Sequence, residues 1–225
     1  MRANMEEETK KKGGYIGQAW LVILLALVYG GALAGVQTAL DPVIQENRRK
    51  ETYDVIPKLV PGADAAKTKK FTITDAQGKE RHVYQANGAA GAQLGWVVPA
   101  GGQGFADRID LLIGINDDLS KITGMYVLDQ KETPGLGNYI GQDFFEKRFK
   151  NKRTDQPLVV VKGDPAPDSN EIKALTGATI SSDSVATIVN NAIADVEKPL
   201  RQLKADPGTA PQKTPEQKTP KQDTP

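Results

Sequence analysis

The pattern of apolar and polar positions divides the chain into three parts. Residues 13–40 contain no charged residue, and apolar side chains occur there without a polar face. About 20 apolar residues span the hydrocarbon core of a bilayer as a helix, so we predict a transmembrane helix over 13–40. Residues 41–70 then form a juxtamembrane segment that is largely helical up to position 60. In residues 71–204, apolar and polar residues follow one another at the short spacings of strands and amphipathic helices, which indicates a folded domain.

Short apolar runs inside residues 71–204 predict the strands of this domain. The run over 109–115 is almost entirely apolar, which is typical of a central strand covered on both faces. Polar residues at 76–79 and 116–118 predict turns. We predict an α+β fold, an antiparallel sheet with packed helices on one face. Its other strands are expected over 71–74, near Val83, and over 94–98, 122–128 and 158–161, with a short helix over 144–149.

A longer amphipathic helix follows a turn that reads T-G-A-T at residues 176–179 and is expected to end near Pro199. Ser181 or Ser182 suits its N-cap and Asp183 its first turn. The free N–H groups and positive dipole end of a helix start bind phosphates. Its buried face is predicted from apolar residues at helical spacing: Val185, Ile188, Val189, Ala192, Ile193 and Val196.

The two ends of the chain lack an apolar pattern. Lysines in the stub at residues 1–12 favour a cytoplasmic N-terminus. Residues 205–225 are rich in Pro, Thr, Lys and Gln, which predicts a disordered tail. A cleaved signal peptide is an alternative to the retained helix, because Ala32 and Ala34 fit a cleavage site.

Composition excludes several function classes. The formal net charge is +1, which indicates no nucleic-acid partner, and the absence of cysteine excludes thiolate-bound iron–sulfur clusters and disulfides. The single histidine, His82, is predicted to be an exposed strand residue, and no metal site is expected. No G-x-G-x-x-G dinucleotide motif follows a strand. If this protein transfers electrons, its carrier is an organic cofactor.

A second motif, E-T-P-G-L-G, occupies residues 132–137. Pro134 and Gly135 predict a type II turn, since proline fixes the first central φ and glycine permits a positive φ at the second. Leu136 then stands at the tip of the turn, where it can pack on a planar ring.

The two motifs resemble FMN-binding domains whose last threonine carries FMN through a phosphoester bond. They are similar to the G subunit of the Rnf electron-transport complex and to the C subunit of the sodium-pumping NADH:quinone reductase. The resemblance implies covalent FMN on Thr179, attached from FAD by a separate flavin transferase. It assigns to the cofactor site Thr176, Gly177, Ala178, Ser181 and Ser182 from one motif, and Glu132, Thr133, Leu136 and Gly137 from the other.

The same resemblance implies a single-pass protein of the bacterial inner membrane with its FMN domain on the extracytoplasmic side. The protein is expected to relay electrons among the subunits of an Rnf-type complex, which couples ferredoxin:NAD electron transfer to ion translocation. Alternatives are the C subunit of the quinone reductase and a membrane-anchored flavin-binding module without redox function. This sequence departs from the families' pattern at one position. The families usually have aspartate where this chain has Lys173, so the charge next to the modification site, which bears on recognition by the transferase, is reversed.

Overall fold

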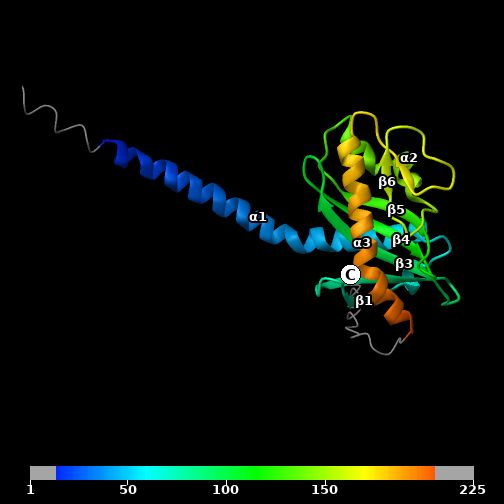
Figure 1. The fold of residues 1–225 in the computed structure, drawn as a ribbon. Coiled ribbons are helices and arrows are strands. Elements are labelled where there is room, and N and C mark those ends of the chain that lie inside the picture. The colour runs from blue at the N-terminus through cyan, green and yellow to red at the C-terminus, as the bar shows by residue number, and fades with distance from the viewer. Residues whose placement is uncertain (1–13, 206–225) are drawn as a thin grey trace, which may run out of the picture. The chain divides into compact units, whose positions relative to one another are not determined.

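The computed structural model describes residues 14–205, so the stub at 1–12, position 13 and most of the tail at 205–225 lie outside the described residues. The chain divides into two compact units between Arg49 and Lys50 (Figure 1). The predicted transmembrane segment and the part of the juxtamembrane segment predicted to be helical form one continuous helix, α1 (Gly14–Leu59), whose last ten residues belong to the second unit.

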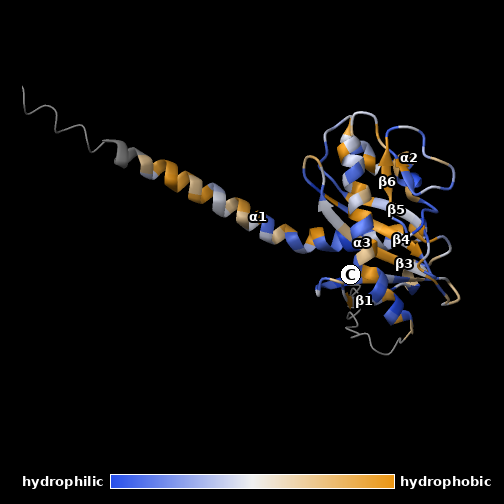
Figure 2. Ribbon diagram, viewed as in Figure 1, coloured by the Kyte–Doolittle hydropathy of each residue, from blue (hydrophilic) through white to orange (hydrophobic). Residues whose placement is uncertain are grey.

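The N-terminal part of α1 is apolar on all sides (Figure 2). Within residues 20–44, its large apolar side chains are 46% to 73% exposed. Among residues 14–205, α1 is the one helix long and apolar enough to cross a membrane. A helix that is hydrophobic all round and has no protein cover suits a lipid environment.

The second unit contains a five-stranded antiparallel sheet in the order β1-β2-β3-β4-β5, so the predicted α+β class is confirmed. Each strand pairs with its neighbour in the sequence, and the run over 109–115 lies within the fourth strand, between two others, as predicted. The strands are β1 (Lys69–Thr74), β2 (Glu80–Asn87), β3 (Gln93–Gln103), β4 (Arg108–Asn116) and β5 (Ile122–Asp129).

Helices cover both faces of the sheet, and the prediction of one covered face was wrong. The long helix α3 (Thr179–Ala205) packs its predicted apolar stripe into the larger core, together with Trp96 and Leu111. The end of α1 packs on the other face, where Leu59 joins Val97 and Leu112. Gly114 permits this approach, since a Cβ there would lie 2.7 Å from the Leu59 carbonyl oxygen.

Smaller elements complete the second unit. The predicted short helix is split into α2 (Asp143–Glu146) and the 3₁₀ turn η3 (Lys147–Phe149). The strand expected over 158–161 is β6 (Val159–Val161), which pairs in parallel with β7 (Glu171–Lys173), a strand that the sequence did not predict. Two further 3₁₀ turns are η1 (Ala65–Lys67) and η2 (Gly137–Gly141).

The expectation that the long helix ends near Pro199 was wrong, because α3 continues to Ala205. Proline has no N–H to donate to the carbonyl four residues earlier, which here is that of Asp195. That carbonyl accepts a hydrogen bond from the Ala76 N–H instead, at 3.1 Å. Leu200 is fully buried, so the turn beyond the proline is held by packing.

Candidate functional site

The turn at residues 133–136 has the predicted type II geometry. The Leu136 N–H donates to the Thr133 carbonyl at 3.2 Å, and Gly135 has φ +78°. A side chain at this φ would be strained, which explains the glycine. The turn presents Leu136, whose surface is 44% exposed, and leads directly into η2.

The T-G-A-T segment forms the entrance to α3. Gly177 has φ +78°, and the Ala178 carbonyl accepts from the Ser182 N–H at 3.0 Å. Ala178 therefore occupies the N-cap position and Thr179 is the first helical residue. The predicted capping by Ser181 or Ser182 was wrong, and Asp183 lies beyond the first turn. The half-buried Thr179 thus lies where the first N–H groups of a long helix lack intrahelical acceptors.

The two motifs are in contact. A Cβ on Gly177 would lie 2.8 Å from Cδ2 of Leu136, so the leucine at the turn packs against the T-G-A-T backbone. A Cβ on Gly137 would lie 2.8 Å from Oγ of Ser181. Both glycines permit a close approach between segments that lie about 40 residues apart in the sequence.

Three of the predicted site residues point into the protein rather than to its surface. Glu132, Ser181 and Ser182 are 4%, 2% and 0% exposed. The Ser181 hydroxyl donates to Oε2 of Glu132 at 2.6 Å. The Ser182 hydroxyl donates to the Ala178 carbonyl at 2.9 Å and accepts from the Leu175 N–H at 3.0 Å. These side chains hold the site together from within.

Four of the remaining predicted residues lie at the surface of the protein. Thr133, Leu136, Thr176 and Gly177 are exposed, whereas Ala178 and Gly137 are buried beneath them. Ile180, next to the candidate threonine, is 60% exposed. An exposed apolar surface beside a helix start suits a ligand that joins a planar ring to a phosphate.

Sequence reasoning missed the loop that follows β3. Its Ala106 N–H donates to Oε1 of Glu132 at 3.1 Å, and Phe105 beside it is 59% exposed. A Cβ on Gly104 would lie 2.3 Å from the same oxygen. The Gly104-Phe105 pair could have pointed to this loop in the sequence. The loop comes close to Glu132, however, only when the sheet is folded.

Comparison with known proteins identifies the family. The FMN-binding domain family matches residues 104–194, which include both motifs. The G subunit of the proton-translocating ferredoxin:NAD(+) oxidoreductase complex of Clostridium ljungdahlii is 31% identical over 77% of this chain and 86% of its own length. The chain belongs to this G-subunit family. The G subunit of the Na(+)-translocating ferredoxin:NAD(+) oxidoreductase complex of Acetobacterium woodii is 34% identical over 62% of this chain and 69% of its own length.

The fold of this family member also has a counterpart among solved structures. The crystal structure of Shewanella oneidensis NqrC aligns with a TM-score of 0.53 at 23% identity, over 57% of this chain and 63% of that one. This similarity supports the fold. The membrane-complex relatives and the apolar α1 together show that the chain is associated with a membrane.

The strand that leads into T-G-A-T is fixed by Arg148. Its guanidinium lies 5.3 Å from the ring centre of Phe145 and 5.6 Å from that of Phe144. It donates hydrogen bonds to the carbonyls of Lys173 and Ala174.

Lys173, the residue that departs from the family pattern, forms an exposed ion pair with Asp164. A carboxylate is therefore present near this position, supplied from a different segment.

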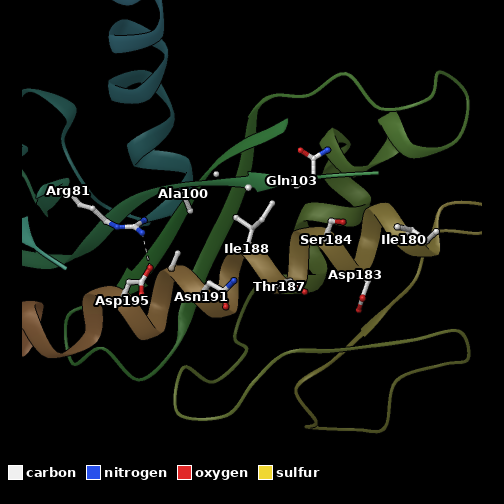
Figure 3. A pocket seen from close by; sticks show the side chains of 13 residues that line it. Arg81, Ala100, Gln103, Ile180, Asp183, Ser184, Thr187, Ile188, Asn191 and Asp195 are labelled. Atoms are coloured by element: carbon white, nitrogen blue, oxygen red, sulfur yellow. Dashed lines mark hydrogen bonds and ion pairs between the residues drawn. The ribbon is translucent and has the colours of Figure 1, made fainter. Parts of the chain in front are cut away.

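A groove of about 320 Å³ runs along α3 beside the site (Figure 3). It extends from Ile180 to the ion pair between Arg81 and Asp195, and residues 100–103 of β3 form its other wall. Strand β2 pairs with β3 only as far as Val97, and residues 98–103 of β3 pair with β4. The sequence did not predict this groove, because the groove depends on where β2 and β3 diverge.

Other titratable groups lie apart from the motifs. His82 is exposed on β2, as predicted, and partial desolvation of its ring, followed by the charge of Lys70, lowers the pKa of its imidazole. Burial raises the pKa of Glu146 from 4.5 to about 7, although its carboxylate accepts from the Val127 N–H at 2.9 Å. Within residues 14–205, no three His, Cys, Asp or Glu side chains are grouped for metal binding.

Proposed function

We propose that this protein is a membrane-anchored electron carrier that holds FMN covalently on Thr179. The observation that carries the proposal is the contact of the two motifs at the start of α3, within the family's matched region. In this site Thr176 and Gly177 would surround the attachment point, and Thr133 and Leu136 would contact the ring. Glu132, Ser181 and Ser182 support these segments from inside.

FMN supplies a planar ring that accepts and donates electrons one at a time. The chain contributes attachment, orientation and an apolar surface. Thr179 lies at the positive end of a 27-residue helix, which favours a phosphate there. Its hydroxyl is a weak nucleophile at neutral pH unless it is activated. We propose that a separate flavin transferase attaches the FMN with FAD as its donor, as the resemblance of the two motifs to FMN-binding domains implies.

The complex that this carrier serves is an Rnf-type one. The G subunits match most of this chain, whereas the C subunit of the Na(+)-translocating NADH-quinone reductase of Yersinia pestis is 30% identical over only 48% of it. We propose that the protein passes electrons between cofactors of its membrane partners, in a complex that translocates ions. Membership of a quinone reductase, in the place of its C subunit, is the second candidate.

Replacing the attachment threonine tests the proposal. Thr179→Ala, expressed together with the transferase, is expected to lose all acid-stable flavin fluorescence in denaturing gels, because the next hydroxyls in the helix, Ser181 and Ser182, are buried. Thr176→Ala is the matched control, since it removes a neighbouring hydroxyl of the same motif and is expected to keep the label. A fluorescent Thr179→Ala protein would overturn the assignment, and a colourless wild-type protein would favour a module without flavin.

The anchor is proposed to be retained and single-pass, with the FMN domain outside the cytoplasm. The lysines before the apolar segment favour this orientation. Protease added to intact spheroplasts is expected to digest the domain, and protease added to inverted vesicles to spare it. The opposite pattern would reverse the orientation. A mature N-terminus at Gly35 would show a cleaved signal peptide.

A further inference from the structure

The carboxylate of Glu132 joins three segments of the domain. One oxygen, Oε2, accepts from the Ser181 hydroxyl at 2.6 Å in the first turn of α3. The other, Oε1, accepts from the Ala106 N–H at 3.1 Å in the loop between β3 and β4. The Glu132 N–H itself donates to Oε1 of Gln130 at 2.7 Å. A carboxylate that is 4% exposed is thus paired on both oxygens.

Two glycines enclose this carboxylate. A Cβ on Gly104 would lie 2.3 Å from Oε1, and a Cβ on Gly137 would lie 2.9 Å from Oε2. No real Cβ fits at such distances, so both positions require glycine for the carboxylate to occupy its place. The glycine that follows Leu136 therefore makes room for Glu132.

The Ser181 contact fixes the end of α3 that carries Thr179. Ser181 is the third helical residue, so its backbone belongs to the same turn as Thr179. A negative charge at a helix N-terminus also interacts favourably with the helix dipole. The hydrogen bond between Glu132 and Ser181 spans 49 positions of sequence and ties the E-T-P-G-L-G segment to the attachment turn.

We propose that Glu132 is a positioning residue for flavin attachment, which acts through Ser181 and the 104–107 loop to present the Thr179 hydroxyl. The inference rests on the proposed function. In the attachment step, the threonine oxygen bonds to the FMN-side phosphorus of FAD and the diphosphate bridge breaks. AMP leaves, and the hydroxyl proton passes to the transferase. Glu132 forms no bond in this step and holds the turn in which it occurs.

The test measures the initial rate of attachment. Full-length apo-protein, made without the transferase, is incubated in detergent with purified transferase and FAD, and covalent flavin is followed by gel fluorescence. Glu132→Ala removes the hydrogen bonds from Ser181 and Ala106 and is expected to slow attachment at least about tenfold, since one hydrogen bond to a charged group is already sufficient for that effect. Glu132→Gln keeps an acceptor for Ala106 and a donor for Ser181, and is expected to restore most of the rate.

Glu146→Gln is the matched control, because Glu146 is also buried and also accepts a backbone N–H, from Val127. It is expected to leave the rate unchanged. Hydrogen exchange of the apo-protein provides a second readout. The amides of residues 182–185, the first that have helical acceptors, are expected to exchange faster in Glu132→Ala and not in Glu146→Gln.

Each outcome decides one question. A folded Glu132→Ala protein with wild-type attachment and exchange would overturn the positioning role. If Glu132→Ala does not fold, Ser181→Ala replaces it, and a wild-type rate in that variant overturns the role equally. Thr179→Ala, run in the same assay, must remain unlabelled. Labelling of that variant would refute the proposed attachment site, independently of Glu132.

Discussion

Two buried glutamates in this domain accept a backbone hydrogen bond, and they differ in what else surrounds them. Glu132 also accepts from Ser181 and lies between two glycines that its carboxylate requires. Glu146 accepts from Val127, and burial, the largest cause, together with Asp143, raises its pKa to about 7 despite this hydrogen bond and the charge of Lys58. The comparison teaches that burial alone does not mark a functional carboxylate. Here the distinguishing feature is a partner, Ser181, in the first turn of α3.

The largest expected effect comes from filling the space beside Glu132. Gly137→Ala would place a Cβ within 2.8 Å of Oγ of Ser181 and 2.9 Å of the carboxylate. We expect a loss of about 3 kcal/mol in the free energy of unfolding, together with slower flavin attachment, because overpacking displaces buried atoms. Chemical denaturation of the apo-protein measures the first effect and gel fluorescence the second.

Gly141→Ala is the control for this variant. It lies in the same segment, but its Cβ would meet only Val127, at 3.8 Å, an ordinary contact. We expect its stability to remain within about 0.5 kcal/mol of wild type. Equal stability of the two variants would mean that the Glu132 carboxylate can move away from a Cβ at position 137. The enclosure by glycine would then no longer distinguish Glu132 from Glu146.

A smaller effect is expected from pH at Glu146. Its folded pKa of about 7 lies above the usual 4.5, so the folded state binds the proton more tightly than the unfolded state. The contribution of this group to stability is therefore fully present below about pH 4.5 and is lost as pH rises to about 7. This group is expected to contribute a decrease of about 2 kcal/mol between pH 5 and pH 7.

Denaturation curves at several pH values check this contribution. Glu146→Gln carries no titrating group and should lack this part of the slope. Glu132→Gln should leave it in place, because the pKa shift belongs to the other glutamate. An identical pH slope in wild type and Glu146→Gln would contradict the assignment.

Local chemistry explains what the sequence predicted correctly. The Pro134-Gly135 pair determines the type II turn, and alternating or continuous apolar runs locate most of the strands. These features depend on residues close in sequence. The uncharged segment within α1 is equally local, because no fold is needed to recognise it.

Long-range contacts account for what the sequence missed. Ser181 and Ser182 have the composition of N-caps, but Ala178 takes that position while the two hydroxyls bind Glu132 and Ala178. Helix α3 passes Pro199 because the Ala76 N–H satisfies the carbonyl that proline leaves free. The pairing of β6 with β7 likewise depends on tertiary packing.

The central claim, that Thr179 carries FMN, is tested most directly by locating the flavin in the mature protein. Trypsin is expected to release residues 174–201 as one peptide, because proline follows Lys198 and blocks cleavage there. Fragmentation of this peptide by mass spectrometry assigns the modified residue. The account predicts a single FMN phosphodiester on Thr179. A flavin on Thr176, Ser181 or Ser182, or a peptide without flavin in a protein made with its transferase, would contradict it.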